Sequence, residues 1–428
     1  MGGETGVTGS RAGQPFHSPP LPTLHVSSIS GPKRSPKRPR EETAGLADVF
    51  PYYAGFSFDW ARDQLLSTAP DESAIVLDPW NGSGTTTLAA ASNGNRSVGV
   101  DLNPVASLVS SLRSQVAASS TAFDPPANRP GAPLPSEDPL LAWLSPSTTR
   151  RVRDWTSGLR GCSKPVFTLG YVSLFRVIRS LTTSFEGSNP TWVKRAESVD
   201  DAVHIEDGQL DALLVADQKH VLGRLAPDGD ERSWSSLITA SANRLPIADD
   251  SIDVILTSPP YLTRIDYAVA YARELAILGV DIAKDRTLRS GLMGTTLIRP
   301  TRTSVDSDYG SLALNLVNQV SQHKSKASAG YYLKQVRQYL DDLASSFDEI
   351  SRVAKSSATL TLVVQDSYYK DIHIRLADIC IEEAESRGWK LESADPKEVR
   401  HLLTAVNTAA RKYAKGRVDE TVVILKKG

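Results

Sequence analysis

The sequence predicts an α/β fold built on a mostly parallel sheet, because apolar segments typical of buried strands alternate with segments of helical periodicity. This alternation occupies residues 74–116 and resumes at Ser236. Near the end of the chain, 389–394 and 421–425 can pair as an antiparallel hairpin. The region between the two alternating parts follows a different pattern. We therefore expect one α/β unit interrupted by an insertion.

The first part of the unit is short and regular. Each expected strand is a brief apolar run without alternation, which is typical of a strand covered on both faces. The expected elements are a helix at 59–66, a strand at 74–77, a helix starting at 88–93, a strand at 97–100 and a helix at 104–116.

The middle of the chain departs from this pattern. Residues 119–138 are rich in proline, and 139–195 read as helices with an apolar stripe that includes Trp143 and Trp155. Residues 196–230 are polar and show no clear periodicity. Arginines decorate the other helix faces, and they could bind phosphates or simply form a solvated face. They are Arg150, Arg151, Arg153, Arg160, Arg176 and Arg179.

The last part returns to strands and helices. A strand is expected at 252–256, and residues 264–330 read as helix and long polar loop. A strongly amphipathic helix follows, with apolar residues at helical spacing. The remaining expected elements are that helix at 331–353, a strand at 358–364 and a helix at 374–388.

Composition places few limits on function. The chain has 428 residues, 40% hydrophobic and 23% charged, with a net charge of −1. No run of about 18 apolar residues and no signal-peptide pattern is seen, so a cytoplasmic protein without a membrane span is expected. Cys162 and Cys380 are too few for a disulfide framework or a four-cysteine zinc site, and no metal site is predicted.

The charge is unevenly distributed along the chain. Residues 1–40 carry six basic side chains and one acidic one, a net charge of +5, which leaves −6 for the remainder. The stretch 33–40 is basic and interrupted by prolines, so it could touch nucleic acid phosphates or act as a solvated tail. We expect residues 1–45 to be a disordered basic tail.

The segment Thr257–Tyr261 is the most informative part of the sequence. Two consecutive prolines, Pro259 and Pro260, cannot donate ladder hydrogen bonds and must end the preceding strand. The result is a stiff loop with the Ser258 hydroxyl, backbone carbonyls and an aromatic ring. In an open α/β sheet, ligands bind at the carboxyl ends of the strands. This loop suits a planar base that carries an exocyclic amino group.

A second loop, Asp78–Thr85, joins the first strand to its helix. Gly82 and Gly84 would let the backbone approach a ligand closely, and Asp101 at the end of the next strand can accept both hydroxyls of a ribose. The patterns G-x-G-x-x-G and G-x-x-x-x-G-K-[ST] are absent, which disfavours a dinucleotide and a P-loop nucleotide. S-adenosylmethionine fits better, because an acid such as Asp78 suits its cationic end.

Together these motifs resemble the DNA amino-methyltransferases of the N4-cytosine/N6-adenine type. That family has an Asp-Pro-Phe-x-Gly-Ser-Gly-Thr cofactor loop, which Asp78–Thr85 matches with Trp80 in place of Phe. Its Gly-x-Asp-x-Asn-Pro segment matches Gly99–Pro104, and its Pro-Pro-aromatic catalytic loop matches Ser258–Tyr261. The aromatic segment Pro51–Phe56 resembles the one that closes over the methionine end of the cofactor. These motifs cover about a quarter of the chain.

The resemblance implies a Rossmann-like class I methyltransferase with a mostly parallel seven-stranded sheet, a terminal antiparallel hairpin and helical insertions. It implies S-adenosylmethionine as cofactor and Ser258, Pro259, Pro260 and Tyr261 as catalytic residues. The cofactor-binding residues that it implies are Tyr53, Phe56, Asp78, Pro79, Asn81, Gly82, Ser83, Gly84, Thr85, Asp101, Leu102 and Ser241.

The same resemblance suggests a division of the chain. The tail at 1–45 would precede a cofactor-binding part at 46–118. A proline-rich linker and helical insertion at 119–230 would be a candidate for target recognition. The catalytic part would be 231–428, with a further insertion near 280–330.

Two features depart from the family pattern. Ser241 stands where the family usually has an acid that contacts the cofactor's adenine, so recognition of adenine at that place is in doubt. The cofactor loop also precedes the catalytic loop, which is not the order of the commonest Ser-Pro-Pro-Tyr enzymes. The long insertion between the two loops leaves open which segment reads the target.

The resemblance implies direct methyl transfer to a base that has left the duplex. Ser258 and the Pro259 carbonyl would accept the two N–H bonds of the amine, Tyr261 would stack on the base, and the methyl would lie about 3 Å away. The Ser in the first position favours cytosine N4 over adenine N6. A cognate restriction or defence partner would fit such an enzyme.

Two other functions remain open. RNA (tRNA) base amino-methyltransferases share both loops in this order, but they usually carry an additional N-terminal RNA-binding domain, and residues 1–50 are too short to supply one. The other alternative is a catalytically inactive nucleic-acid-binding module that keeps the fold. Arg264 and Asp266 could line the mouth of the site or form an ion pair that holds the loop.

Overall fold

The computed structural model describes most of the chain. The described residues are 35–38, 46–52, 55–115, 121–127, 133–187, 192–225, 235–262, 265–300, 308–325, 328–399 and 417–428. Most of the predicted basic tail, Tyr53 and Arg264 lie outside these ranges.

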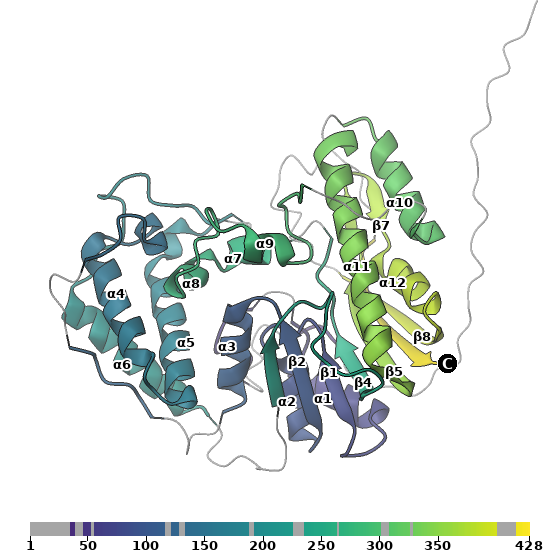
Figure 1. The fold of residues 1–428 in the computed structure, drawn as a ribbon, viewed down its shortest axis with the longest axis horizontal. Helices are drawn as coiled ribbons and strands as arrows, with labels where there is room; N and C mark the ends of the chain where they lie inside the picture. Colours follow the sequence, from purple (N-terminus) through teal and green to yellow (C-terminus); the bar gives the residue numbers. More distant parts are fainter. Residues whose placement is uncertain are drawn as a thin grey trace, which may run out of the picture.

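A seven-stranded sheet forms the centre of the protein (Figure 1). Its first five strands are parallel, and β9 runs antiparallel to both of its neighbours, β5 and β8. This confirms the predicted fold class, including the terminal antiparallel hairpin. In spatial order the strands are β3 (Ser235–Thr239), β2 (Arg96–Asp101), β1 (Ile75–Asp78), β4 (Ile252–Thr257), β5 (Ala354–Gln365), β9 (Asp419–Lys427) and β8 (Trp389–Glu398).

Helices cover both faces of the sheet, because alternate residues of each central strand point to opposite sides. Val76 and Val254 belong to an apolar cluster with α1 (Phe58–Thr68) and α2 (Thr85–Ser92). Their neighbours Leu77 and Ile255 belong instead to the cluster of the opposite face. The helices of that cluster are α10 (Ser311–Gln322), α11 (Leu333–Val353) and α12 (Leu376–Glu385).

A helical lobe extends from the β3 edge of the sheet (Figure 1). Helix α3 (Pro104–Arg113) contacts β3 on one side and α5 of the lobe on the other. The lobe has its own apolar cluster, in which Trp155 and Phe175 are fully buried. Its helices are α4 (Pro146–Leu159), α5 (Lys164–Leu181), α6 (Asp207–Leu222) and α8 (Ala272–Ile277).

Helix α6 corrects the sequence interpretation of 196–230, which showed no periodicity. The helix buries only Leu210, Leu214, Gln218 and Val221, a narrow stripe in an otherwise polar segment. Such a stripe is too thin to stand out from the sequence, and the helix depends on contact with α5.

The arginines of the lobe mostly form ion pairs within the protein. Four of the six predicted phosphate-binding candidates pair with carboxylates, so their positive charges are balanced internally. The pairs are Arg151–Asp211 at 2.6 Å, Arg153–Asp138 at 2.7 Å, Arg176–Asp217 at 2.9 Å and Arg179–Glu274 at 2.6 Å.

The remaining elements are short. They include a two-stranded hairpin. They also include α10, which lies in the region 264–330 that was predicted to be helix and long polar loop. These elements are α7 (Tyr267–Ala270), α9 (Thr287–Gly291), α10 (Ser311–Gln322), β6 (Ser367–Tyr369), β7 (Ile372–Ile374), 3₁₀ turns at Pro139–Ala142 and Thr183–Phe185, and a π-helical turn at Ser328–Tyr332. None of the helices in the described ranges is long and apolar enough to cross a membrane.

The packing of α11 against the sheet gives a test of the fold. Phe347 is fully buried there, so Phe347→Ala should lower the free energy of unfolding by about 3–5 kcal/mol through lost burial and a residual cavity. Lys334→Ala on the exposed side of the same helix should change it by less than about 0.5 kcal/mol. Urea unfolding followed by circular dichroism measures both. Equal losses in the two variants would contradict this packing.

Candidate active site

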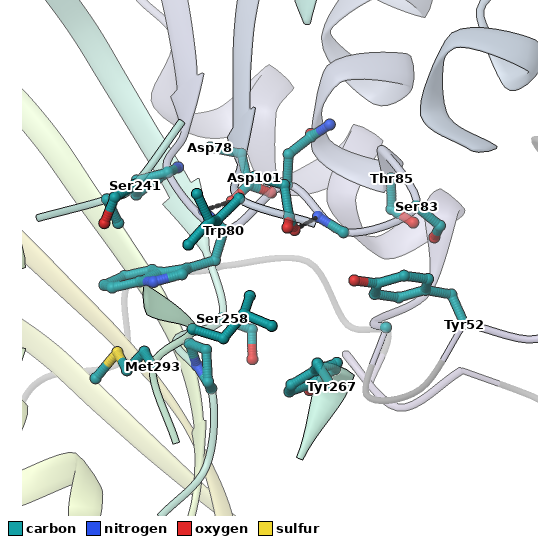
Figure 2. Close-up of a pocket in the computed structure, with 18 of the residues that line it drawn as sticks. Tyr52, Asp78, Trp80, Ser83, Thr85, Asp101, Ser241, Ser258, Tyr267 and Met293 are labelled. Atoms are coloured by element: carbon teal, nitrogen blue, oxygen red, sulfur yellow. Dashed lines mark hydrogen bonds between the residues drawn. The ribbon is translucent and has the colours of Figure 1, made fainter. Parts of the chain in front are cut away.

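The order of the strands reverses direction between β1 and β4. The chain builds outward from β1 through β2 to β3, and outward from β4 through β5 on the other side. At such a switch point the loops beyond the carboxyl ends diverge and leave a crevice. A cleft lies there, lined by both predicted loops (Figure 2).

Asp78 joins the two loops. It ends β1 and is buried, and its Oδ1 accepts a hydrogen bond from Thr257 Oγ1 at the end of β4 (2.6 Å). Its Oδ2 accepts from Thr86 Oγ1 at the start of α2 (2.6 Å), and Thr86 also donates to the Leu256 carbonyl (3.0 Å). Burial raises the pKa of Asp78 to about 6, although these hydrogen bonds oppose the shift.

Asp101 occupies the matching position at the end of β2. Its Oδ2 accepts from the Gly82 backbone N–H (2.9 Å) and its Oδ1 accepts from the Asn103 N–H (2.8 Å). Burial raises the pKa of Asp101 to about 6. The carboxylate lines the cleft and each oxygen retains a second lone pair, so both oxygens could accept hydroxyl groups of a ligand.

The two glycines of the cofactor loop differ in their surroundings. Both have positive φ, at 48° for Gly82 and 83° for Gly84. Gly82 lines the cleft, whereas Gly84 does not. A Cβ at Gly84 would lie 2.1 Å from Ser110 Oγ on α3. Gly84 therefore serves the backbone turn and the close packing of α2 on α3, and not the ligand space.

Arg113 is a residue that the sequence analysis missed. It is buried at the end of α3, and its Nη1 donates to the carbonyl and hydroxyl oxygens of Ser83 (2.7 and 2.9 Å) and to Thr85 Oγ1 (3.2 Å). The guanidinium thus fixes the cofactor loop at Ser83 and Thr85 from the buried side of that loop. A basic residue in the last turn of a helix is common, so no sequence signal pointed to this contact.

The far end of the cleft lies beside β2 and β3. Leu102, Ser241 and Asn243 line it. The Asn243 amide is oriented from behind, since its Nδ2 donates to Asp342 (3.1 Å) and its Oδ1 accepts from Ser346 (2.7 Å). The hydroxyl of Ser241 accepts from the Asn243 N–H at 3.2 Å.

The catalytic loop is only partly open to the cleft. Ser258 and Pro260 line it, but Pro259 and Tyr261 do not. The Pro260 carbonyl already accepts a hydrogen bond from the Tyr339 hydroxyl of α11 (2.7 Å). Tyr261 is 9% exposed and belongs to the apolar cluster beneath the loop.

Several other residues complete the walls of the cleft. Tyr52, Trp80, Tyr267 and Met293 line it and come from four different segments (Figure 2). From the aromatic segment 51–56 the resemblance implied Tyr53, which lies outside the described residues, and Phe56, which lines the cleft, but not Tyr52. It gave no reason to choose Tyr267 or Met293, because each lies in or near an insertion.

Most of the predicted site residues do converge. Of the fifteen candidates in the described ranges, twelve line the cleft and Gly84, Pro259 and Tyr261 do not, while Tyr53 lies outside those ranges. The twelve are Phe56, Asp78, Pro79, Asn81, Gly82, Ser83, Thr85, Asp101, Leu102, Ser241, Ser258 and Pro260.

Three residues that follow the catalytic loop or strand β5 lie outside the cleft; they are Asp266, Asp366 and Tyr368. Asp266 is almost fully buried and pairs with Arg289 at 3.0 Å, so it holds its loop and does not line the mouth. Asp366 pairs with His373 at 3.1 Å, and Tyr368 stacks on the same imidazole with centroids 4.7 Å apart. Neither residue lines the cleft.

Known methyltransferases resemble this chain in sequence, although no protein-family model matches it. The Type II methyltransferase M.BsoBI of Geobacillus stearothermophilus is 26% identical over 406 residues, which cover 79% of this chain and 77% of that protein. This chain is a sequence relative of Type II methyltransferases. M.AvaI of Nostoc sp. is 27% identical over 176 residues, 38% of this chain and 36% of that methyltransferase.

Solved methyltransferase structures align with lower similarity. A SAM-dependent methyltransferase from Methanosarcina mazei is 9% identical with a TM-score of 0.31, over 85% of this chain and 96% of that chain. Geranyl diphosphate methyltransferase in complex with SAM is 8% identical with a TM-score of 0.33, over 87% and 86% of the two chains. The methyltransferase fold is assigned from the strand order of the sheet.

The packing at Gly84 gives a test of the loop. Gly84→Ala should lower the free energy of unfolding by about 2–4 kcal/mol, because positive φ and the clash with Ser110 add. Gly279→Ala is the matched control, since its φ is +84° but no atom lies within 4 Å of the added Cβ. It should cost only about 1 kcal/mol. Similar urea midpoints for the two variants would show that the close approach to α3 is unimportant.

Proposed function

We propose that this chain transfers a methyl group from S-adenosylmethionine to the exocyclic amino group of a DNA base, with cytosine N4 favoured and adenine N6 as the second candidate. The observation that carries the proposal is the single cleft lined by both loops. A hydrogen bond of 2.6 Å from Thr257 Oγ1 to Asp78 Oδ1 holds the cofactor loop next to the catalytic loop. Sequence similarity to Type II methyltransferases supports DNA as the substrate.

The residues of the cleft fit the cofactor. Asp101 is available to ribose hydroxyls, and Asp78 places a negative charge near the position expected for the cationic methionine end. Gly82 lines the cleft, and a Cβ there would lie 2.9 Å from the Tyr52 ring, so the glycine lets that ring pack against the loop. Leu102 and Ser241 line the far end, where an adenine ring would lie. The choice of S-adenosylmethionine also agrees with the methyltransferase relatives.

The catalytic loop supplies the groups that an amine needs. Bound S-adenosylmethionine supplies an electrophilic methyl group. The Ser258 hydroxyl lines the cleft and makes no hydrogen bond within the described part of the chain, so it can accept one N–H of the amine. The second N–H could be accepted by the backbone carbonyl of Ser258 or Pro260, because both residues line the cleft and the Pro260 carbonyl keeps a second lone pair beside its hydrogen bond from Tyr339. Two accepted hydrogen bonds would localise the nitrogen lone pair for in-line attack.

The target base would have to leave the duplex. The cleft lies beyond the carboxyl ends of β1 and β4. A base that is paired within a duplex cannot present its amine to Ser258 inside this cleft. Flipping the base costs a few kcal/mol, which contacts in the cleft would offset.

Methyl transfer is tested directly with a tritiated donor and, separately, duplex DNA, single-stranded DNA and bulk tRNA. We expect label in DNA. Ser258→Ala should lower kcat by about 10²-fold or more, by analogy with the loss of one preorganised hydrogen-bonding group, and should leave cofactor affinity nearly unchanged. Ser321→Ala on α10, outside the cleft, is the matched control.

The outcomes of this assay separate the candidate functions. Label only in tRNA would reject the DNA proposal in favour of an RNA amino-methyltransferase. Cofactor binding without label in any of the three substrates would favour an inactive module. A Ser258→Ala protein with full kcat would reject the proposed role of that hydroxyl.

The two carboxylates predict a pH dependence of cofactor binding. Both have a pKa of about 6, so they are charged above pH 6 and protonated below it. If the ligand prefers the charged forms, affinity should be full near pH 7.5 and should fall up to about tenfold per pH unit and per group below pH 6. Calorimetry of S-adenosylmethionine binding from pH 5 to 8 measures this.

Asp101→Asn is the matched variant for this prediction. It removes one of the two titrating groups, so affinity at pH 7.5 should be lower and its decline toward pH 5 shallower. If the affinity of the unmodified protein for S-adenosylmethionine stayed constant from pH 5 to 7.5, the role given to these carboxylates would be contradicted.

A further inference from the structure

The middle of helix α11 is joined to the catalytic loop by a hydrogen bond. Tyr339 lies on this helix, the long green one in Figure 1, and is almost fully buried. Its hydroxyl donates to the Pro260 carbonyl at 2.7 Å. Pro260 belongs to the catalytic loop and lines the cleft, as Ser258 does. A residue 79 positions away in the sequence therefore holds the backbone of the loop that is proposed to bind the amine.

The catalytic loop has few means of fixing its own backbone. Its pairing with β5 ends at Thr257, and Pro259 and Pro260 have no N–H with which to donate a hydrogen bond. Further along, the Leu262 carbonyl accepts from the Ser367 hydroxyl at 3.4 Å, which is long for a bond between two oxygens. The 2.7 Å bond from Tyr339 is the stronger of these two restraints on the loop beyond β4.

Tyr339 is a fixed donor. Its ring lies in the same apolar cluster as Tyr261 and Leu262, so close packing leaves it little room to turn away from the loop. Burial raises the pKa of the Tyr339 hydroxyl well above its usual value. A phenol is protonated below its pKa, so this hydroxyl keeps its proton throughout the neutral range and can donate to Pro260.

The same face of α11 supports a second part of the cleft wall. Asp342 and Ser346 follow Tyr339 by about one and two helical turns, so the three side chains lie in one stripe. Asp342 accepts from the Asn243 amide (3.1 Å), and the Ser346 hydroxyl donates to the same amide (2.7 Å). Because Asn243 lines the cleft, α11 orients groups at both the catalytic loop and the far end of the cleft.

We propose that Tyr339 is a positioning residue for methyl transfer, whose hydroxyl fixes the catalytic loop at the Pro260 carbonyl and so keeps Ser258 within reach of the amine. The inference rests on the proposed function and adds to it a residue that acts through the loop. Tyr339 does not line the cleft, so it touches neither the base nor the cofactor there. Its contribution is geometric, because a displacement of about 1 Å can cost about 10²-fold in rate.

A purely structural role is the competing explanation. A buried hydroxyl that satisfies a carbonyl stabilises a protein whether or not that carbonyl belongs to an active site. The two roles predict different measurements. A structural residue changes the fraction of protein that is folded, whereas a positioning residue changes the rate of the folded protein while the affinity for its ligands stays constant.

The experiment compares Tyr339→Phe, which removes only the hydroxyl, with Tyr309→Phe as the matched control. Tyr309 also donates its hydroxyl to α11, at the Arg337 carbonyl (3.1 Å) and Asp341 (2.7 Å), but it lies outside the cleft. The single-turnover rate of methyl transfer to saturating DNA is measured, because product release does not limit that rate. Calorimetry gives the Kd for S-adenosylmethionine, and circular dichroism gives the folded fraction.

Tyr339→Phe should lower the single-turnover rate by about 10- to 100-fold, because the loop loses the bond that sets its position. Its Kd for S-adenosylmethionine should stay within about twofold of that of the unmodified protein, and it should be folded at the assay temperature. Tyr309→Phe should keep the single-turnover rate within about twofold.

Other outcomes overturn the proposal. A full single-turnover rate in Tyr339→Phe would show that the bond does not position the loop. A rate that falls only in proportion to the folded fraction would leave Tyr339 with a structural role. A rise in the cofactor Kd that accounts for the lost rate would assign the effect to cofactor binding. An equal loss in Tyr309→Phe would assign it to the stability of α11 as a whole.

Failure of the proposed function would be seen separately, because the unmodified protein would then transfer no label to DNA. Hydrogen exchange at the Tyr261 and Leu262 amides still tests the positioning of the loop in that case, without cofactor or nucleic acid. Tyr339→Phe should exchange these amides at least about fivefold faster under conditions where it is folded, and Tyr309→Phe should not. Unchanged exchange in Tyr339→Phe would reject the proposal.

Discussion

The hydrogen bond from Thr257 to Asp78 is the constraint on which the site depends. It is 2.6 Å long and joins the last residues of two adjacent parallel strands. Asp78 begins the predicted cofactor loop and Thr257 begins the predicted catalytic loop, so the bond fixes the position of one loop relative to the other. Because Asp78 is buried, loss of the Thr257 hydroxyl would leave a carboxylate oxygen with one fewer donor in a poorly solvated place.

Burial of Asp78 and Asp101 has a cost that fits a binding site. Their raised pKa values mean that their charged forms are less favourable in the folded chain than in the unfolded one. This destabilisation is present above pH 6 and disappears below about pH 4, where both states are protonated. A ligand that supplies hydroxyl donors and a positive charge would relieve it. The cleft is therefore arranged to gain stability when a ligand of that chemistry binds.

The helical lobe contributes to the site through packing. Arg179 of α5 lies over the ring of Tyr271 at 5.6 Å and pairs with Glu274 at 2.6 Å. Tyr271 stacks on Tyr52, whose ring would contact a Cβ at Gly82. A continuous set of contacts thus runs from the lobe to the cofactor loop. Arg151, Arg153, Arg176 and Arg179 of the lobe pair with carboxylates, so these four charges are balanced within the protein.

The sequence alone determined the sheet and the two loops. Strand β4 and the loop at Pro259 and Pro260 could be predicted because prolines end a strand whatever surrounds them, and Gly82 and Asp101 follow from local backbone and strand-end chemistry. What only the tertiary structure decided is which side chains meet in the cleft. Arg113, Tyr267 and Met293 come from distant segments, and Tyr261 turns into the core, because those positions depend on packing between insertions that leaves no local pattern in the sequence.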